Sequence, residues 1–150
     1  MKIIISFLIF VFSITYQPND AVTYARHYCK YYNSAYSYSN YPETRQNDDA
    51  KFVSQCLIAG GQKLDGCPNV NRYGLISSIS NLRSCLQQKG WKSSKTKPPN
   101  FRAGYPMIKL DLSHAIIATL VSGSSIYYSA HSPDTCDRKL DSKLYYYFYL

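Results

Sequence analysis

Hydrophobic residues recur at helical spacing in three stretches of the N-terminal half of the chain. The first stretch predicts an amphipathic helix over residues 20–32, with Asn19-Asp20 as its cap. The second predicts a helix that begins at Asp48 or Asp49 and ends at Gly60-Gly61. The third predicts another helix of the same period. The apolar positions are Val22, Ala25, Cys29 and Tyr32, then Phe52, Val53, Cys56 and Leu57, and finally Leu75, Ile79, Leu82 and Leu86.

Beyond Pro98-Pro99 the pattern changes to short apolar stretches that are typical of β-strands. Strands are predicted over residues 105–111, 114–121, 126–131 and 144–150. The second and third are joined by Ser122-Gly123-Ser124-Ser125, a sequence that favours a hairpin. Helices followed by strands indicate the α+β class, with N-terminal helices packed on an antiparallel sheet.

Residues 1–16 have the pattern of a secretory signal peptide. Lys2 is followed by the apolar run Ile3–Ile14, which is too short to span a bilayer comfortably. We therefore predict a signal peptide over residues 1–16 and a single domain over residues 17–150. The mature protein is expected to be secreted, or held in the lumen of the secretory pathway, with no membrane segment after cleavage.

The chain has five cysteines, so at least one is left without a partner inside the molecule. An oxidising compartment favours disulfides between the others, although the spacing does not determine the pairs. None of the cysteines has C-x-x-C spacing, which argues against a structural zinc site. We predict no cofactor. The cysteines are Cys29, Cys56, Cys67, Cys85 and Cys136.

The formal charge of +8 favours anionic polymers as partners, such as bacterial wall material or acidic glycans. Solubility alone is the alternative explanation, and no sequence-specific nucleic-acid motif accompanies the charge. The densest basic run, Lys89–Lys97 (KGWKSSKTK), predicts a solvated loop. The 16 tyrosines favour partly buried rings with bonded hydroxyls, or else a surface on which sugars stack.

Two of the three histidines, His114 and His131, bracket the predicted hairpin. If Val121 pairs with Ile126, then Ile116 faces His131, and His114 lies diagonally on the same face, roughly 7–8 Å away. A register shifted by one residue would place the two rings on opposite faces. A cysteine–histidine hydrolase needs a thiolate at the start of a helix, an imidazole that takes and returns its proton, and a polar group that orients this imidazole. His114 and His131 are candidates for the second and third of these parts.

The stretch from Asn47 to Gly61, NDDAKFVSQCLIAGG, resembles the nucleophile segment of the putative amidase domain family, which is similar to N-D-C-x-N-F-V-S-Q-x-L-x-x-G-G. Lys89-Gly90-Trp91 resembles the family's K-G-W turn. Ser113-His114-Ala115 is similar to its catalytic histidine strand, and the segment from Ala130 to Asp134 to its A-H-x-x-D segment. The resemblance extends over roughly residues 20–140.

The resemblance implies a papain-like fold related to the NlpC/P60 cell-wall peptidases. It also implies hydrolysis of peptide amides, with bacterial cell-wall peptides as substrates. His114 takes the place of the catalytic base. His131 is our choice for the group that orients it, with Asp134 as the alternative. The family's nucleophilic cysteine falls on Asp49, so the resemblance implies a pseudoenzyme or a catalytically impaired member. Asp48, Trp91 and Asp134 are candidate binding residues.

Three alternatives concern the altered position. Cys56 lies seven residues beyond Asp49 on the same helical face, but roughly 10.5 Å deeper along the axis, which is too far to replace a first-turn thiol. Asp49, His114 and His131 together form a set that could bind Zn²⁺ or Fe²⁺. Finally, the domain could be a binding module for wall fragments, glycans or a protein, acting through the cleft or through its basic, tyrosine-rich surface.

Overall fold

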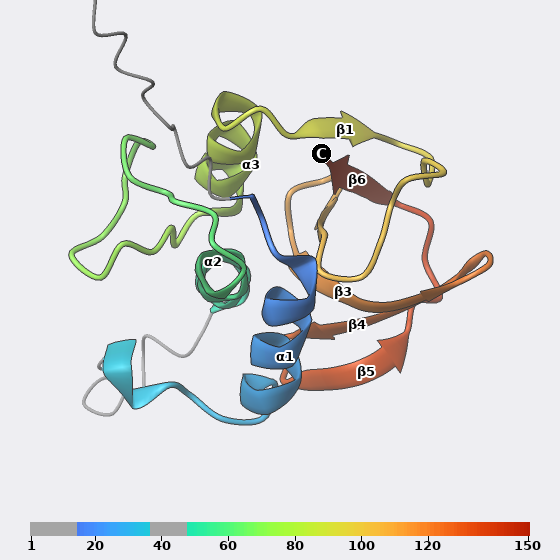
Figure 1. Ribbon diagram of the computed structural model, residues 1–150, viewed down its shortest axis with the longest axis horizontal. Coiled ribbons are helices and arrows are strands. Elements are labelled where there is room, and N and C mark those ends of the chain that lie inside the picture. Colours follow the sequence, from blue (N-terminus) through green and yellow to red (C-terminus); the bar gives the residue numbers. More distant parts are fainter. Residues whose placement is uncertain (1–14, 37–47) are drawn as a thin grey trace, which may run out of the picture.

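The computed structural model describes residues 15–36 and 48–150. Most of the predicted signal peptide lies outside these residues, as does most of the predicted loop from Asn33 to Asn47. The described part of the chain forms three α-helices and one six-stranded antiparallel sheet, with the helices preceding the strands in the sequence (Figure 1). The predicted α+β class is therefore confirmed. No helix in the described ranges is long and apolar enough to cross a membrane.

The three helices occur where the hydrophobic pattern predicted them, although the first begins two residues earlier and ends four residues earlier than the predicted range of 20–32. Helix α1 spans Pro18–Tyr28, because Pro18 occupies the first turn, where its missing N–H costs nothing. Helix α2 spans Asp49–Ala59, as predicted. Helix α3 spans Ile79–Gln88 and begins after Ser78, whose hydroxyl accepts the Asn81 N–H. A short 3-10 helix, Ser34–Tyr36, follows α1.

The sheet has the strand order β1-β6-β2-β3-β4-β5. Strands β2 to β5 follow one another as a meander, and the C-terminal strand inserts between β1 and β2. Two strands were not predicted. Residues of β1 fall in the expected loop at Lys89–Lys97, and the polar sequence of β5 lacks an apolar pattern. The strands are β1 (Lys92–Ser94), β2 (Pro106–Lys109), β3 (Ala115–Ser122), β4 (Ser125–Ala130), β5 (Thr135–Lys139) and β6 (Tyr145–Tyr149).

The β3–β4 hairpin begins in the predicted register and then departs from it. Val121 pairs with Ile126, but an irregularity between Ala118 and Leu120 shifts the ladder. Beyond it Ser129 pairs with Ile117, one residue earlier than the uniform register requires. A shift of one residue sends alternate side chains to the other face of a strand. The expectation that both histidines converge on one point fails for this reason.

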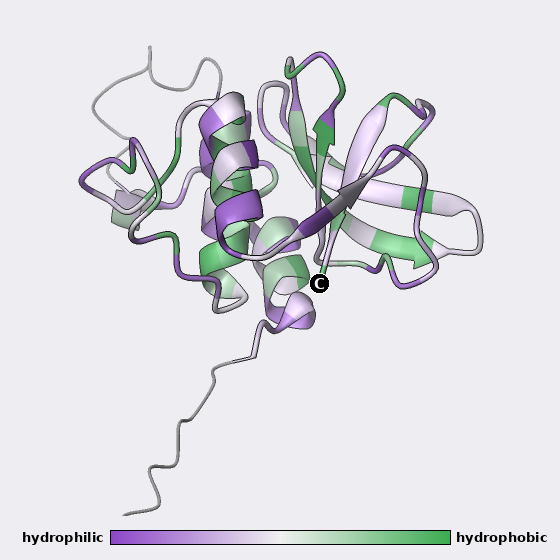
Figure 2. Cartoon of the chain, turned by 90° about the horizontal axis from the view of Figure 1, so that it is seen from above, coloured by the Kyte–Doolittle hydropathy of each residue, from purple (hydrophilic) through white to green (hydrophobic). Residues whose placement is uncertain are grey.

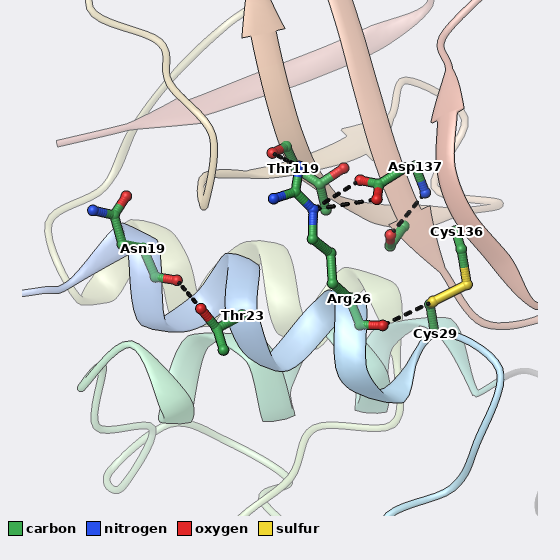
Figure 3. Close-up of polar contacts among 8 residues, drawn as sticks. Asn19, Thr23, Arg26, Cys29, Thr119, Cys136 and Asp137 are labelled. Carbon is green, nitrogen blue, oxygen red and sulfur yellow. Dashed lines mark hydrogen bonds and ion pairs between the residues drawn. A yellow bond between two sulfur atoms is a disulfide. The ribbon is translucent and has the colours of Figure 1, made fainter.

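Helix α1 is fastened to the far edge of the sheet at the level of this irregularity (Figure 3). The Arg26 Nε–H donates to both carboxylate oxygens of Asp137, each at 3.2 Å. Its terminal N–H donates to the Thr119 carbonyl at 3.1 Å, within the irregular part of β3. Next to the ion pair, a disulfide joins Cys29 to Cys136. Arg26 therefore links α1 to the irregular part of β3 and to β5.

The main core lies between the sheet and helices α2 and α3, and a second cluster lies under α1. Viewed from above, the helices stand on one side of the sheet, and hydrophobic positions recur along helices and strands (Figure 2). Tyr16, the last residue of the predicted signal peptide, packs edge-on against Trp91 at 5.1 Å between ring centroids. Its hydroxyl donates to the Gly104 carbonyl at 2.6 Å. Tyr16 therefore belongs to the folded domain.

Candidate functional site

Two consecutive carboxylates, Asp48 and Asp49, stand at the start of α2, and both are buried. Neither acts as the predicted side-chain cap: Asp48 occupies the N-cap position without a capping hydrogen bond from its side chain. Each carboxylate instead contacts one of the two hairpin histidines. The helix start is therefore the point where α2 meets the ends of β3 and β4.

Asp49 binds the beginning of β3 through a single oxygen. Its Oδ2 lies 3.1 Å from His114 Nδ1 and accepts the Ala115 backbone N–H at 3.0 Å. With the carboxylate ionised, Nδ1 is the donor, and the neutral imidazole keeps its lone pair on Nε2. The His114 side chain is 19% exposed, against 6% for Asp49. The imidazole is therefore the more accessible member of the pair and the one that can exchange a proton with a bound molecule.

His131 occupies a different and deeper position. Its Nδ1 lies 2.6 Å from Asp48 Oδ2, and its Nε2 lies 2.7 Å from the Tyr28 carbonyl oxygen. The ring stacks on Phe52 with centroids 4.1 Å apart. Its side chain is only 1% exposed. Both ring nitrogens are thus engaged, and the structure joins His131 to Asp48 rather than to His114.

A cavity of about 380 Å³ opens beside Asp49. Its wall is formed by the N-terminal turn of α3 and by the connection between β2 and β3. Four of its lining residues are serines, which can donate and accept hydrogen bonds. None of these serines was predicted as a site residue from the sequence. The lining residues are Asp49, Ser77, Ser78, Ile79, Ser80, Leu112 and Ser113.

The remaining predicted residues lie elsewhere. Trp91 is buried in the core, where its indole N–H donates to Gln62 Oε1 at 2.8 Å. This packing gives Trp91 a structural role, and Trp91 does not line the cavity beside Asp49. Asp134 is exposed in the turn between β4 and β5. Cys56 is fully buried, and burial raises the pKa of its thiol well above the usual value, as expected for a core residue.

The metal-binding alternative required Asp49, His114 and His131 to face one point. Within residues 15–36 and 48–150, no three His, Cys, Asp or Glu side chains form a group that could hold a metal ion. His131 is held by Asp48 and the Tyr28 carbonyl instead. The separation of the two histidines therefore removes the geometry on which that alternative depended.

The family model described as putative amidase domain matches residues 15–105, more than half of the chain. The chain belongs to the putative amidase domain family. The matched segment contains helices α1 to α3 together with Asp48 and Asp49, and it ends before both hairpin histidines. Comparison with curated proteins and with solved structures finds no match to this chain. Membership of the putative amidase domain family is therefore established, whereas the papain-like fold stays a prediction.

As a member of the amidase family, the chain presents a helix start, an accessible imidazole and an adjoining polar cavity in one place. The Asp49 carboxylate orients the imidazole, as an acidic residue does in hydrolase triads. Sequence reasoning identified Asp49 and His114 but missed two partners of the deeper pair. These are the Tyr28 carbonyl and Ser132, whose hydroxyl accepts the Asp48 N–H at 2.8 Å. Neither contact has a sequence signature, because each joins residues that are distant along the chain.

Proposed function

We propose that this protein is a secreted amidase-family domain that binds peptide amides, such as those of bacterial cell-wall peptides, and is impaired in cleaving them. One observation carries the proposal: the Asp49 carboxylate, at the position where the family resemblance expects a thiol, is hydrogen-bonded to His114 and to the Ala115 N–H. Asp49 therefore acts as a partner of the base rather than as a free nucleophile.

A carboxylate at this position is poorly suited to the family's reaction. A thiolate attacks an amide carbon to give a thioester, which water then hydrolyses. A carboxylate that attacked the same carbon would form a tetrahedral intermediate. From it the carboxylate leaves more readily than the amine, so the intermediate would collapse back to the amide instead of losing the amine to give a mixed anhydride. The two hydrogen bonds to Oδ2 also lower the nucleophilicity of this oxygen. Asp49 keeps the negative charge beside the imidazole but not the chemistry of a thiolate.

The rest of the site supports binding of a peptide. The cavity beside Asp49 lies within the size range of small-ligand sites, at about 380 Å³. Serine hydroxyls on its wall can bond to peptide N–H and C=O groups. His114 does not line this cavity but is hydrogen-bonded to Asp49, which does, so its Nε2 atom is an acceptor for a ligand that extends beyond the cavity. We therefore place the peptide between the N-terminal turn of α3 and the β2–β3 connection.

Secretion is part of the proposal and rests on the predicted signal peptide and the cysteines. Two disulfides, Cys29–Cys136 and Cys67–Cys85, join four of the five cysteines. Such bonds persist in oxidising compartments and are rare in the cytosol. Expression of the full-length precursor with detection of the protein in the medium tests this part by itself.

Restoring the thiol tests the chemistry. We compare the natural protein with Asp49→Cys and Asp49→Asn for release of amino groups from cell-wall peptides. We expect hydrolysis only by Asp49→Cys, and its loss in the double variant Asp49→Cys, His114→Gln. Asp49→Asn is the matched control, because it keeps the size of the side chain without either charge or thiol.

Binding is measured separately, by calorimetry of the same peptides with the natural protein. We expect saturable binding that weakens when Ser78 is replaced by a bulky residue, as in Ser78→Trp. Hydrolysis by the natural protein that is abolished by His114→Gln would show that the site is catalytically competent and would overturn the proposal. Absence of both binding and hydrolysis in every variant would equally reject it.

A second candidate function is a binding module that acts through its basic surface. It is favoured by a specific observation, a second cavity whose rim carries three lysines. This cavity shares no lining residue with the one beside Asp49, so binding there does not require the Asp49 site.

A further inference from the structure

A cavity of about 470 Å³ is lined by residues of three connections between strands. These connections run at the end of the sheet that is away from helices α2 and α3 (Figure 1). Three segments far apart in the sequence form the cavity: the loop after β1, the β3–β4 hairpin and the connection from β5 to β6. Its volume is in the range of sites that hold small molecules. The lining residues are Lys95, Thr96, Lys97, Ser124, Ile126, Leu140, Asp141, Ser142, Lys143 and Tyr147.

The cavity combines an apolar interior with a basic rim. Ile126 and Tyr147 are buried at 4% and 5% exposure, and they supply apolar surface to its walls. Lys95 and Lys97 belong to the loop after β1 and Lys143 to the connection between β5 and β6, and all three line the same cavity. An apolar wall with a few converging polar groups is the usual composition of a ligand site.

The charges at this rim are not balanced by the protein. Three lysines and only one acidic residue, Asp141, are among the residues that line the cavity. Among the described residues, none of the three lysines takes part in an ion pair. Like charges that converge over a low-dielectric wall raise the local potential and attract an anion. The basic run at Lys89–Lys97 thus has a specific place in the fold: its last residues border a cavity.

We propose that this cavity binds a small organic anion, in which a carboxylate, sulfonate or similar group is carried on an apolar or ring-shaped body. The ammonium groups of the lysines, carried on flexible side chains, bind the anionic group of the ligand by charge attraction. The hydroxyls of Thr96, Ser124 and Ser142 supply hydrogen bonds at the rim. The body of the ligand lies against Ile126 and Tyr147. A free inorganic anion would leave this apolar wall uncovered, and a neutral apolar molecule would not use the lysines.

This site is independent of the Asp49 site. His114 directly precedes β3, and Ser124 lies in the turn that follows its other end. The eight residues of β3 separate them by roughly 25 Å at about 3.3 Å per residue. Failure of the peptide-binding proposal therefore leaves this one untouched, and the two are tested with different ligands and different variants.

The test uses 8-anilinonaphthalene-1-sulfonate, a sulfonate on an apolar aromatic body whose fluorescence rises on binding. We expect one site per folded protein and a roughly tenfold weaker affinity in the double variant Lys97→Glu, Lys143→Glu, because two attractive charges become repulsive. Lys63→Glu is the matched control, since Lys63 is an exposed lysine outside the cavity. Ser124→Trp, at an exposed turn position, is expected to fill the opening and abolish binding without altering thermal stability.

Competition then identifies the kind of anion. A uronic-acid disaccharide and an N-acyl amino acid represent the two sources of a carboxylate on a larger body, and inorganic phosphate represents charge alone. Displacement of the dye by either organic acid, at concentrations where phosphate has no effect, supports the proposal and tells the sources apart. Equal weakening in the Lys63→Glu control, equal displacement by phosphate, or dye binding unchanged by Ser124→Trp would each overturn it.

Discussion

His131 Nδ1 lies 2.6 Å from Asp48 Oδ2. Asp49, which follows Asp48 in the chain, is hydrogen-bonded to the other hairpin histidine, His114. The two pairs differ in exposure, since His131 is 1% and His114 19% exposed. In the deeper pair, Nε2 faces the Tyr28 carbonyl, which can only accept a hydrogen bond. Both ring nitrogens are therefore bonded inside the protein, and the pair has the geometry of a structural contact. His114 is the more exposed of the two rings, and proton exchange with a ligand belongs to its proposed role.

Replacing His131 should strongly destabilise the fold. His131→Ala leaves Asp48 buried without its main partner and removes the ring stacked on Phe52. Breaking a buried pair from one side costs about 3–5 kcal/mol. Urea unfolding of His131→Ala measures the loss, and His27→Ala, at an exposed position on α1, is the control that should change little. A loss below about 1 kcal/mol would show that the Asp48–His131 contact contributes little to folding.

Removing Arg26 should loosen the junction of α1 with β3 and β5. Arg26→Ala deletes an exposed ion pair to Asp137 and a hydrogen bond to the Thr119 carbonyl. Because both partners are about half exposed, we expect a loss of only about 1 kcal/mol in the free energy of unfolding. Amide hydrogen exchange should rise around the irregular part of β3. Lys30→Ala is the control, and an unchanged exchange pattern in Arg26→Ala would argue against this anchoring role.

The irregular register of β3 also marks the limit of what the sequence predicts. The helices and four of the six strands follow from local patterns, because apolar spacing records which face is buried. The irregularity between Ala118 and Leu120 has no such local signal, and the donor that bonds to its Thr119 carbonyl comes from Arg26, which is distant in the sequence. A uniform ladder therefore led to the wrong partner for His131, although both histidines were correctly placed near the start of α2.

The cysteine pairs show the same limit. An odd count predicts one unpaired cysteine, and the structure leaves Cys56 unpaired. The choice of Cys29 with Cys136, which are 107 residues apart, requires the packing of α1 beside β5 and cannot be read from spacing. The Asp49 cavity likewise arises where α3 and the β2–β3 connection meet, so its serines carry no recognisable motif.

Cys56 should be the single thiol that becomes reactive on unfolding. It is fully buried, and burial raises the pKa of its thiol, so little thiolate forms in the native protein. Without reductant, alkylation by iodoacetamide should add no label to the folded protein and one label in denaturant. Peptide mapping should locate that label at Cys56. Two or three labels in denaturant would mean that one of the disulfides does not form, and labelling of the native protein would contradict the burial of this residue.

Stability should fall at alkaline pH because buried tyrosines resist ionisation. Burial raises the pKa of Tyr16 well above the ordinary 10.0, and it raises the pKa of Tyr145 to about 12. Above pH 10 the unfolded chain loses these protons while the native state keeps them, so the contribution is complete below pH 10 and declines as pH rises. For Tyr16 the decline is about 1.4 kcal/mol per pH unit. Urea unfolding between about pH 8 and pH 11 measures it. Tyr16→Phe should reduce the slope, whereas exposed Tyr31→Phe should not.

Gly104 should be intolerant of any side chain, because the segment that begins with Tyr16 passes directly over it. A Cβ added at Gly104 would lie 2.3 Å from the Pro18 carbonyl oxygen, and the backbone there has φ of +90°. Gly66 is the matched control: its φ is +80°, but nothing lies within 4 Å of an added Cβ. Gly66→Ala therefore measures the conformational cost alone, about 1 kcal/mol. We expect Gly104→Ala to cost at least about 2 kcal/mol more, because backbone atoms must move apart. Equal losses in thermal or urea unfolding would show that residues 16–18 do not pack on the domain in solution.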